Sequence, residues 1–505
     1  MIPRKQYFHI ARVVLENVTG LSLATGHPDH GFDSVLVRDA NGLPTLPGTA
    51  LAGVLRQAFA RLNRDEAAED LFGWQRGNKG KPSHVHVGWG CLLDQAGQAV
   101  FGLKLSPDDR EALGKDELLG PLLETDHQRQ RVRLNHRGVA ADTGKFDRAV
   151  LPAGHRFAVE ICVESEQAED PHWKELLGLL ASGQIRLGGS TRAGLGRMQL
   201  IECYQRCFDL HDAEDAKAFR EMGPSPDDTT GLKEARPEDV VPAELITGKL
   251  QLRCDDFFRF GGEAGEPGSL DEKHDEKSGK PKKPADLLPK FEPVIDWSTG
   301  KAEKARGLLL IPGSSVKGAL AHRFAFHYNA LTGVFADKLD ADEVKGWDKT
   351  DHCPGTRALF GFVEDGKTDG GEAARAGCLF IDDARLKIDP NELQRLMHVA
   401  IDQFTGGARN GMLFEEQLVA TEQDICIELS LDRQRLEDNC GKVVDKKGNH
   451  PDHNTILEVL GRALQDLTTG MLPLGAASGR GHGFFSGRLE GDLNATLNTT
   501  QEQGA

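Results

Sequence analysis

Two Pro-Gly turns are the positions of this chain best suited to hold a phosphate. Leu46–Phe59 reads LPGTALAGVLRQAF, and Ile311–Phe324 reads IPGSSVKGALAHRF. A Pro-Gly turn that leads directly into a helix leaves the first N–H groups of that helix unpaired, and anions bind there. Hydroxyl and basic side chains on the following turns add donors. The residues predicted to bind phosphate are Gly48, Thr49, Arg56, Gly313, Ser314, Ser315, Lys317 and Arg323.

Two glycine-rich loops offer a second set of basic residues. LGGSTRAGLGRMQL begins at Leu187, and LGAASGRGHGFFSGRL begins at Leu474. Flanking glycines allow close approach to a ligand, so we predict that Arg192, Arg197, Arg480 and His482 bind phosphate as well. The alternative is that the turns are simple helix caps and that the glycines permit tight sheet packing. Both interpretations can hold together.

The turns and loops belong to a longer duplication that must position them. Six segments recur in the same order: an opening strand, a short apolar run with an NG or TG turn, the Pro-Gly helix ending in LFG, a glycine-rich basic segment with a strand, a helix, and the closing loop. Hairpins with two or three helices per copy predict an α+β fold, two tandem ferredoxin-like domains. A dinucleotide-binding fold is disfavoured because no GxGxxG follows a strand and opens a helix.

Chain length and local composition predict the domain boundaries. Its 505 residues exceed one core and suit two repeats. We predict a first domain at 1–210, an acidic linker at 211–243, a second domain at 244–490 with a polar insertion at about 261–290, and a C-terminal tail at 491–505. No run of about 20 apolar residues and no signal-peptide block is present, so a cytoplasmic protein is expected.

Net charge and cysteine content bear on nucleic-acid binding, disulfides and metal sites. The net charge of −17 argues against a protein coated by nucleic acid, so any RNA contact must use local basic patches. Nine cysteines without a CxxC pair favour reduced thiols. Cys203, Cys207 and His211 are a weak metal candidate. His84 and His86 share one strand face, for which a polar surface is a commoner explanation than a metal pair.

The order TG, FDSVLVRD, LPGTALAG, LFG and GGSTRAGLGR resembles the RAMP superfamily of CRISPR-associated RNA-binding proteins. Within it, the chain is most similar to the repeated backbone subunit of type III effector complexes, the Csm and Cmr assemblies. The resemblance covers about Tyr7 to Ile201 and about Glu244 to Leu489. The tandem fusion of two such domains departs from the commoner single-domain subunit.

This resemblance implies a scaffold in which each RRM-like domain grips the crRNA backbone and a protruding hairpin interrupts the guide–target duplex. The expected partners are crRNA, target RNA and the other CRISPR effector subunits, without a membrane. His136, Arg137, Lys145 and Arg409 fall in segments where the family carries that hairpin, and RNA contact is expected of them. The modest aromatic content of 6% favours backbone shape readout over base stacking.

In the family, a loop Asp cleaves target RNA with a divalent metal, Mg²⁺ or another cation. Asp33 in HGFDSVLVRD matches that motif, so it is the expected catalytic residue and metal ligand, although a loop Asp also serves as a turn cap. Glu292 aligns with it in the second copy; because the insertion before Phe291 makes the alignment uncertain, Asp286 and Asp296 are alternatives.

Two other functions remain open. One is a structural subunit that binds crRNA without cutting. The other is a stand-alone endoribonuclease that processes precursor RNA, although no compact His, Tyr or Lys acid–base set is evident.

Overall fold

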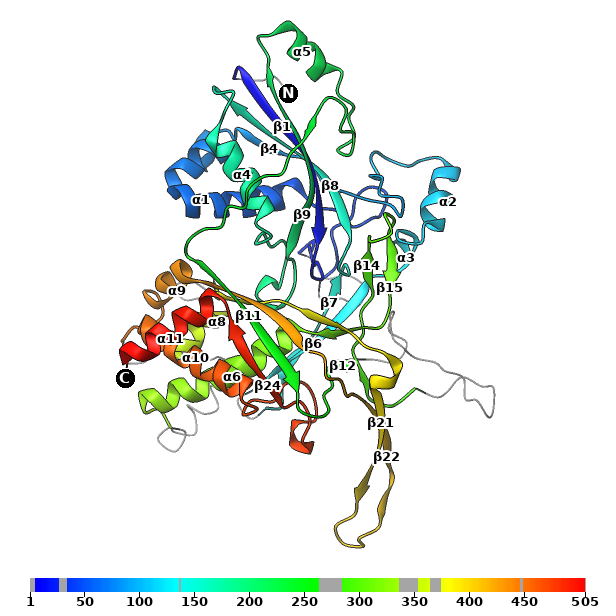
Figure 1. The fold of residues 1–505 in the computed structure, drawn as a ribbon, viewed down its shortest axis with the longest axis vertical. Helices are drawn as coiled ribbons and strands as arrows, with labels where there is room; N and C mark the ends of the chain where they lie inside the picture. The colour runs from blue at the N-terminus through cyan, green and yellow to red at the C-terminus, as the bar shows by residue number, and fades with distance from the viewer. Residues whose placement is uncertain are drawn as a thin grey trace.

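The computed structural model describes residues 5–26, 34–135, 138–262, 284–335, 353–363, 374–445 and 448–504. Within these residues two α+β repeats lie one above the other, each with a sheet backed by helices (Figure 1). None of the described helices is long and apolar enough to span a bilayer.

Repeat 1 follows the order β-α-β-β-α-β. Its opening strand lies in the middle of an antiparallel sheet, between the third and fourth strands of the motif, and the second strand pairs with the third. This is the ferredoxin-like arrangement predicted from the sequence. The six elements are β1 (Tyr7–Asn17), α1 (Gly48–Phe72), β4 (Val85–Val87), β8 (Arg156–Ser165), α4 (Pro171–Ala181) and β9 (Met198–Asp209).

Repeat 2 has the same order and the same sheet, so the tandem α+β fold is confirmed. Its elements are β11 (Leu245–Cys254), α6 (Gly313–Thr332), β19 (Leu379–Ile381), β23 (Ile425–Asp432), α10 (His453–Thr468) and β24 (Phe485–Glu490). Helix α10 shows why the sequence folds this way, because Ile456, Leu460, Leu464 and Leu467 form one buried stripe at helical spacing.

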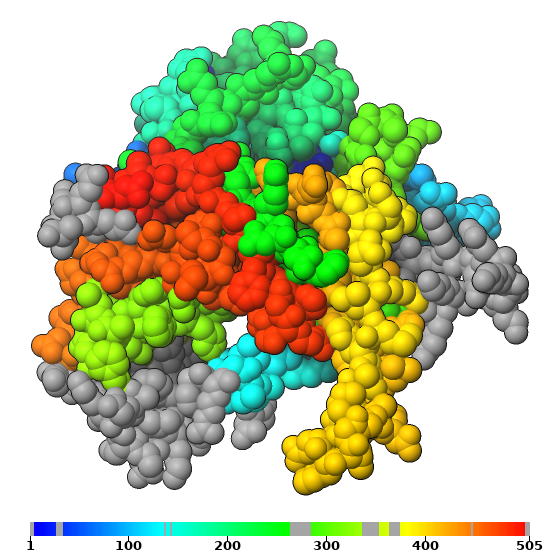
Figure 2. Space-filling view, turned by 60° about the horizontal axis from the view of Figure 1, so that its bottom comes forward, coloured from blue at the N-terminus to red at the C-terminus, as the bar shows by residue number. Residues whose placement is uncertain are grey.

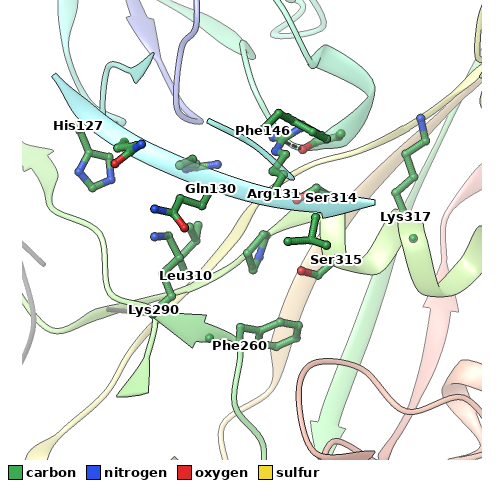
Figure 3. A pocket seen from close by; sticks show the side chains of 18 of the residues that line it. His127, Gln130, Arg131, Phe146, Phe260, Lys290, Leu310, Ser314, Ser315 and Lys317 are labelled. Carbon is green, nitrogen blue, oxygen red and sulfur yellow. Dashed lines mark hydrogen bonds between the residues drawn. The ribbon is translucent and has the colours of Figure 1, made fainter. Parts of the chain in front are cut away.

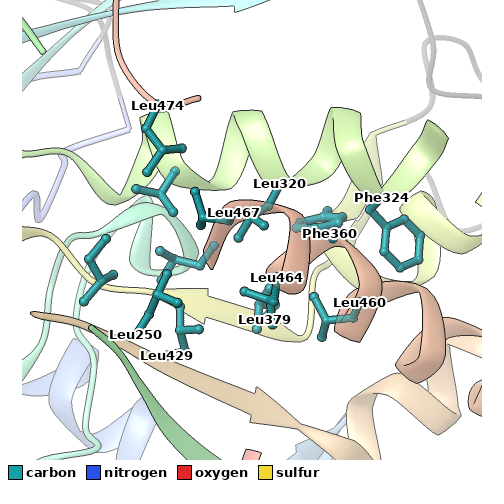
Figure 4. Close-up of a cluster of buried hydrophobic side chains, with 14 of the residues drawn as sticks. Leu250, Leu320, Phe324, Phe360, Leu379, Leu429, Leu460, Leu464, Leu467 and Leu474 are labelled. Carbon is teal, nitrogen blue, oxygen red and sulfur yellow. The ribbon is translucent and has the colours of Figure 1, made fainter. Parts of the chain in front are cut away.

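Each repeat has its own hydrophobic core between sheet and helices. Figure 4 shows the core of repeat 2, where Leu320 and Phe324 of α6 and Leu460 and Leu464 of α10 meet Leu250 of the sheet. Aliphatic and aromatic side chains from both layers fill it, so each repeat buries enough apolar surface to fold around its own centre.

A long hairpin is inserted before the third strand of each repeat, where the sequence predicted one. In repeat 1 it consists of β6 (His127–Leu134) and β7 (Ala140–Val150), and in repeat 2 of β21 (Leu393–Ile401) and β22 (Ala408–Val419). The β21–β22 hairpin projects from the body of the molecule at the bottom of Figure 1.

Short elements complete the two repeats. In repeat 1 they are β2 (Trp74–Arg76), β3 (Lys79–Lys81), β5 (Cys91–Leu92), α2 (Pro107–Lys115) and α3 (Gly120–Glu124). In repeat 2 they are β12 (Gly261–Gly262), β13 (Leu288–Pro289), β16 (Leu308–Ile311), α8 (Pro354–Phe360), β17 (Gly361–Val363), β18 (Ala374–Ala376), β20 (Ala384–Lys387) and α9 (Arg433–Cys440).

The segment predicted as an acidic linker at 211–243 is a connector only in its last third. Residues 211–234 fold back onto repeat 1 through α5 (Ala213–Arg220) and β10 (Lys233–Glu234), which pairs with β9. Phe219, Met222 and Leu232 pack against the sheet. These scattered apolar residues anchor a segment whose acidic composition suggested a linker.

The predicted tail at 491–505 is also structured. It forms α11 (Asp492–Gly504), and Leu493 and Leu497 are buried in the core of repeat 2. Two leucines spaced four residues apart, on one helical face, account for this packing. Of the polar insertion predicted at about 261–290, residues 263–283 lie outside the described part of the chain.

An arm of repeat 2 extends onto repeat 1. It is the hairpin β14 (Val294–Asp296) and β15 (Glu303–Ala305), and its Ile295 and Ala302 are buried in the core of repeat 1. Trp297 at its turn donates a 2.7 Å hydrogen bond from Nε1 to the carbonyl of Gly154, and Arg156 lies over its ring at 4.4 Å. The two repeats therefore share part of one core.

Candidate nucleic-acid interface

A cavity of about 1600 Å³ lies where the two repeats meet, and we call it the junction groove. Strand β6 of repeat 1 forms one side, and the first turns of α6 form another. Figure 3 shows Gln130 of β6 pointing toward Lys290, with Arg131 on the same strand and Ser314, Ser315 and Lys317 at the start of α6. In the space-filling view an opening lies between the cyan β6–β7 hairpin and the orange-red part of repeat 2 (Figure 2).

The junction groove is basic although the chain is acidic overall. Besides Arg129, the described residues that line it include six Lys or Arg side chains, namely Arg131, Arg133, Lys290, Lys304, Arg306 and Lys317. Asp126 is the one acidic residue among the described lining residues, and it pairs with Arg38 at 2.5 Å. Such a concentration of positive charge raises the local concentration of polyanions.

Three cations in or beside the groove donate to backbone carbonyls, of which Arg131 and Lys317 line it and Arg192 neighbours the lining residue Ala193. Lys317 donates to Phe360 O at 3.3 Å, Arg131 to Ala193 O at 3.3 Å, and Arg192 to Gly377 O at 2.7 Å. Burial, then repulsion from Arg192 and Arg131, lowers the pKa of Lys317 to about 8.

The two arginines are shifted in the same direction. Burial lowers the pKa of Arg131 to about 10, with repulsion from Arg129 as the next cause, and burial lowers the pKa of Arg192 to about 10, with repulsion from Arg435 next. A bound phosphate would supply a counter-charge that offsets the repulsion on Arg131, which lines the groove.

The residues of the two Pro-Gly turns differ in what they contact. A Cβ on Gly313 would lie 2.3 Å from Ile381 O, and one on Gly48 would lie 2.1 Å from Val87 O, so both glycines allow a helix to pack against the end of a strand. The N–H of Gly313 already donates to the buried carboxylate of Asp383 at 2.9 Å. Ser314, Ser315 and Lys317 line the junction groove, whereas Gly48, Thr49 and Arg56 are not among its lining residues.

Glu292 is the centre of a buried ion-pair network between the repeats. Arg129 of β6 contacts both of its carboxylate oxygens, at 2.7 and 2.6 Å, and also reaches Asp383 at 2.5 Å. His127 and Arg385 complete the shell at 3.1 and 3.0 Å. Burial alone would raise the pKa of Glu292, but these partners outweigh it and hold that pKa well below its usual value.

The predicted catalytic role of Glu292 needs correction on physical grounds. Its side chain has no exposed surface, and arginines occupy both of its oxygens. A carboxylate in this position cannot reach an RNA strand or a hydrated metal ion. Glu292 holds the repeats together instead.

Hydrogen bonds between the hairpins and the preceding segments give the register of the two repeats. Ala149 N–H donates to Ser34 O at 2.9 Å, and Gln417 N–H donates to Leu287 O at 2.8 Å. Each donor lies two residues before the bridge that ties its hairpin to the loop after the opening strand, Leu21–Leu151 and Phe258–Val419. Ser34 therefore corresponds to Leu287.

The same register continues through the next residues and changes the alignment of the carboxylates. Asp39 N–H donates to Leu43 O at 2.8 Å, and Glu292 N–H donates to Leu308 O at 3.1 Å, so Glu292 corresponds to Asp39. The residue before Ser34 is Asp33, and the residue before Leu287 is Asp286. Asp286, and not Glu292, is the counterpart of Asp33.

The other acidic candidates are placed differently. Asp33 lies outside the described residues, although Ser34 lies within them. Asp286 is exposed, and its Oδ2 accepts a hydrogen bond from Glu415 N at 2.9 Å, at the base of the β21–β22 hairpin. Asp296 is in the arm, where it caps the turn through Ser298. Hydrogen bonds from Ser298 lower the pKa of Asp296, as expected for a turn cap.

Three of the predicted basic residues, two in the closing loops and one on α6, have carboxylate partners. Arg197 pairs with Asp382 and Glu428 of repeat 2, Arg323 with Asp466, and Arg480 with the buried Glu416 at 2.8 Å. His482 is buried and packs its ring on Phe257. These contacts are structural. Among the described basic residues of the two loops, Arg192 instead donates to the backbone carbonyl of Gly377.

The hairpins carry exposed side chains that the sequence singled out only in part. Lys145 on β7 and Arg409 on β22 are exposed, and His136 and Arg137 lie outside the described residues. Large apolar side chains are exposed along both hairpins, among them Phe146, Met397, Ile401 and Phe404. A hairpin with this surface fits insertion against stacked bases better than packing in a core.

No group of three or more His, Cys, Asp or Glu residues in the described ranges is arranged to hold a metal ion. Cys207 instead contacts the ring of His9 at 3.8 Å, and His86 faces the buried Glu164 at 3.6 Å. The weak candidates Cys203, Cys207, His211 and the pair His84 and His86 are thus not metal clusters in this part of the chain.

Sequence reasoning missed most of the groove's cations. Arg129, Arg131 and Arg133 alternate in HQRQRVRL, a pattern that places them on one face of a strand. Lys290, Lys304 and Arg306 flank the arm and come near β6 only through the packing of one repeat on the other. The alternation of the three arginines on β6 could have been detected in the sequence, whereas no sequence pattern marks Lys290, Lys304 and Arg306.

Comparison with known proteins agrees with the duplicated fold. A family model of the RAMP superfamily matches residues 15–199 and 295–486, so the chain belongs to the RAMP superfamily and carries two RAMP regions. Among solved structures, a chain from the type III-B Cmr-beta complex in its apo state matches with a TM-score of 0.29 and 11% identity, over 38% of this chain and 96% of that one. No curated protein matches.

Proposed function

We propose that this chain is a backbone subunit of a type III CRISPR effector complex, which binds crRNA along the junction groove and cleaves target RNA beside its hairpins. The observation that carries the proposal is the basic junction groove, which lies between strand β6 of repeat 1 and the first turns of α6 in repeat 2. The expected partners are crRNA, target RNA and further effector subunits. Backbone contacts dominate, because the cations of the groove recognise phosphate and not base identity.

Cleavage is assigned to Asp33 in repeat 1 and to Asp286 in repeat 2. Both precede a segment that hydrogen-bonds the base of a hairpin, so each would lie at the same place relative to the RNA. A divalent cation such as Mg²⁺, held by an exposed carboxylate through its water shell, would neutralise charge on the scissile phosphate. Asp286 fits that role because its side chain is exposed.

The test is to replace Asp33 and Asp286 by Ala, singly and together, and to map fragments of a labelled target RNA with the assembled complex. Each single substitution should remove one cut while guide binding is retained, and the double substitution should remove both. Asp296→Ala, an exposed carboxylate in the arm, is the matched control and should leave both cuts. An unchanged pattern in the double variant would favour the non-catalytic structural subunit.

A simpler assay tests the third candidate function, a stand-alone endoribonuclease that processes precursor RNA. Incubation of the isolated chain with precursor RNA should leave it intact, and specific processing would support a stand-alone endoribonuclease. Sequencing of RNA that copurifies with the chain tests the shared premise, because guide-length RNA is expected in the complex.

A further inference from the structure

Within this chain, one repeat already serves as the docking partner of the other. Repeat 1 packs on the β19–β23 side of the outer face of the repeat 2 sheet, the face opposite its helices. Arg186 pairs with Asp382 at 2.6 Å and reaches Ser430, and Arg197 pairs with Glu428. The structure thus records how one RAMP domain stacks on the sheet of the next.

The duplication identifies the equivalent face on repeat 1. Strand β8 corresponds to β23, since Val87 pairs with Ile161 as Ile381 pairs with Leu429. Glu160 and Cys162 of repeat 1 therefore occupy the positions of Glu428 and Ser430. Their neighbours on β1 are Arg12 and Ile10, which face them across the ladder.

That face of repeat 1 is already covered, and the cover is residues 211–234. Phe8 and Ile10 are buried under Phe219 and Leu232, and the rings of Phe8 and Phe219 meet edge to face at 5.3 Å. Arg12, only 4% exposed, donates to the carbonyls of Gly223, at 2.6 Å, and Asp228. We call this segment the cap; its α5 lies at the top of Figure 1, with repeat 2 below.

A second observation agrees with this arrangement independently. Repeat 2 reaches onto repeat 1 with the β14–β15 arm, which is inserted between Glu292 and Leu308. In repeat 1 the corresponding residues, Asp39 and Leu43, are joined directly by a tight turn. Within the described residues, the arm is therefore a feature of repeat 2 and not of repeat 1.

A third difference is in the turn after the second strand. Repeat 2 presents Asp382 and Asp383 there to arginines of repeat 1. The corresponding residues of repeat 1 are Gly88 and the exposed Trp89. The carboxylates that hold a stacked repeat are therefore missing on this side.

From these observations we propose that the cap closes the outer sheet face of repeat 1 to stacking, so that a further RAMP-fold domain adds to this chain only at the closing loop and hairpin of repeat 2. The inference rests on the proposed role in a multi-subunit complex. At the repeat 2 end, the loop that corresponds to the docked 187–196 loop is 474–483, and its Ser478, Gly479 and Arg480 are exposed. The chain is thus an end unit with one open side.

The geometry of the two closing loops supports this direction of growth. Ser190 and Ala477 both adopt left-handed backbone, and short helices η1 (Thr191–Ala193) and η4 (Ser478–Arg480) follow them. The first loop packs against α6 and β19 of repeat 2. The second loop has the same shape, and its Ser478, Gly479 and Arg480 are exposed.

Two matched insertions test the proposal in the complex purified from the native host. A small monomeric fluorescent protein is inserted at an exposed turn of the cap, between Thr230 and Gly231, or in the second closing loop, between Ser478 and Gly479. Exposed turns tolerate such insertions, and an unchanged melting temperature of each purified chain verifies folding. Native mass spectrometry then reports the RAMP-fold subunits that copurify.

The cap insertion should leave the subunit composition unchanged. The loop insertion should lower the amount of the neighbouring RAMP-fold subunit that copurifies at least tenfold. Loss of that subunit from the cap insertion, or its retention in the loop insertion, would overturn the inference. If the unmodified chain itself purifies without RNA and without other RAMP-fold subunits, the proposed function fails, and that result is distinguishable from both.

Discussion

At the scale of single residues, the sequence predicted the type of chemistry better than the residues that perform it. Gly48 and Gly313 were predicted to bind phosphate, and the structure shows that each packs against the end of a strand, a role visible only from the residues that it contacts. Arg197, Arg323 and Arg480 were chosen for their charge, and their partners come from distant parts of the chain. Pairing of distant charges cannot be read from local spacing.

Arg129 should be the most costly of the groove arginines to remove. Arg129→Ala would leave Glu292 and Asp383 buried with fewer counter-charges, and breaking a buried pair costs ~3–5 kcal/mol. Chemical denaturation should show a loss of this order. Arg133→Ala, on the same strand but exposed, is the control and should change stability by no more than about 0.5 kcal/mol. Equal stability of the two variants would contradict a structural role for the network.

Lys317 gives the groove a pH dependence. Its pKa of about 8 means that the side chain is charged below that pH and loses its proton above it. Because RNA phosphate binds the charged form, affinity for a single-stranded RNA should fall as pH rises from 7 to 9, and binding near pH 8 should take up a proton. Lys317→Arg should flatten this profile, since arginine stays charged. Fluorescence anisotropy measures it; identical profiles would show that Lys317 does not contact the RNA.

At the scale of elements, the order of strands and helices followed from periodicity and duplication, and the fold was confirmed in both repeats. The cap and α11 escaped prediction because a few apolar residues in a polar stretch decide their packing. Phe219 and Leu493 have that effect here. Composition averages hide such anchors. The sequence comparison matched Asp33 with Glu292 wrongly for another reason. The arm inserts residues just after Glu292, and this insertion shifts the alignment of repeat 2 against repeat 1.

The start of α6 offers a sharp test of how an element is placed. Gly313→Ala adds a Cβ 2.3 Å from a backbone carbonyl, so overpacking should cost ~1–3 kcal/mol and shift α6 away from β19. Gly318→Ala, on the same helix with no atom within 4 Å of the added Cβ, should instead stabilise by up to ~1 kcal/mol. Thermal unfolding of both variants gives the comparison. A neutral Gly313→Ala would show that the helix does not pack as closely as described.

At the scale of the whole molecule, the packing of the two repeats creates a property that neither repeat has alone, the basic junction groove. The junction groove exists only because β6 of one repeat faces α6 of the other, so a chain with net charge −17 still presents a basic surface there. The sequence predicted the need for such a patch but not its place. Contacts between repeats depend on their relative orientation, which no periodicity encodes.

The arm should make the two repeats unfold together. Ile295 and Ala302 belong to the core of repeat 1, and Trp297 fixes the turn between them through Gly154 and Arg156. Because Trp297 is half-buried, Trp297→Ala should cost less than the ~3–5 kcal/mol of a fully buried aromatic residue. Loosening the arm uncouples the cores, so calorimetry should resolve two transitions where the unmodified chain gives one. Trp89→Ala, with 59% of the side chain exposed, controls for loss of a tryptophan and should leave a single transition. Two transitions already present in the unmodified chain would mean that the shared core does not couple the repeats.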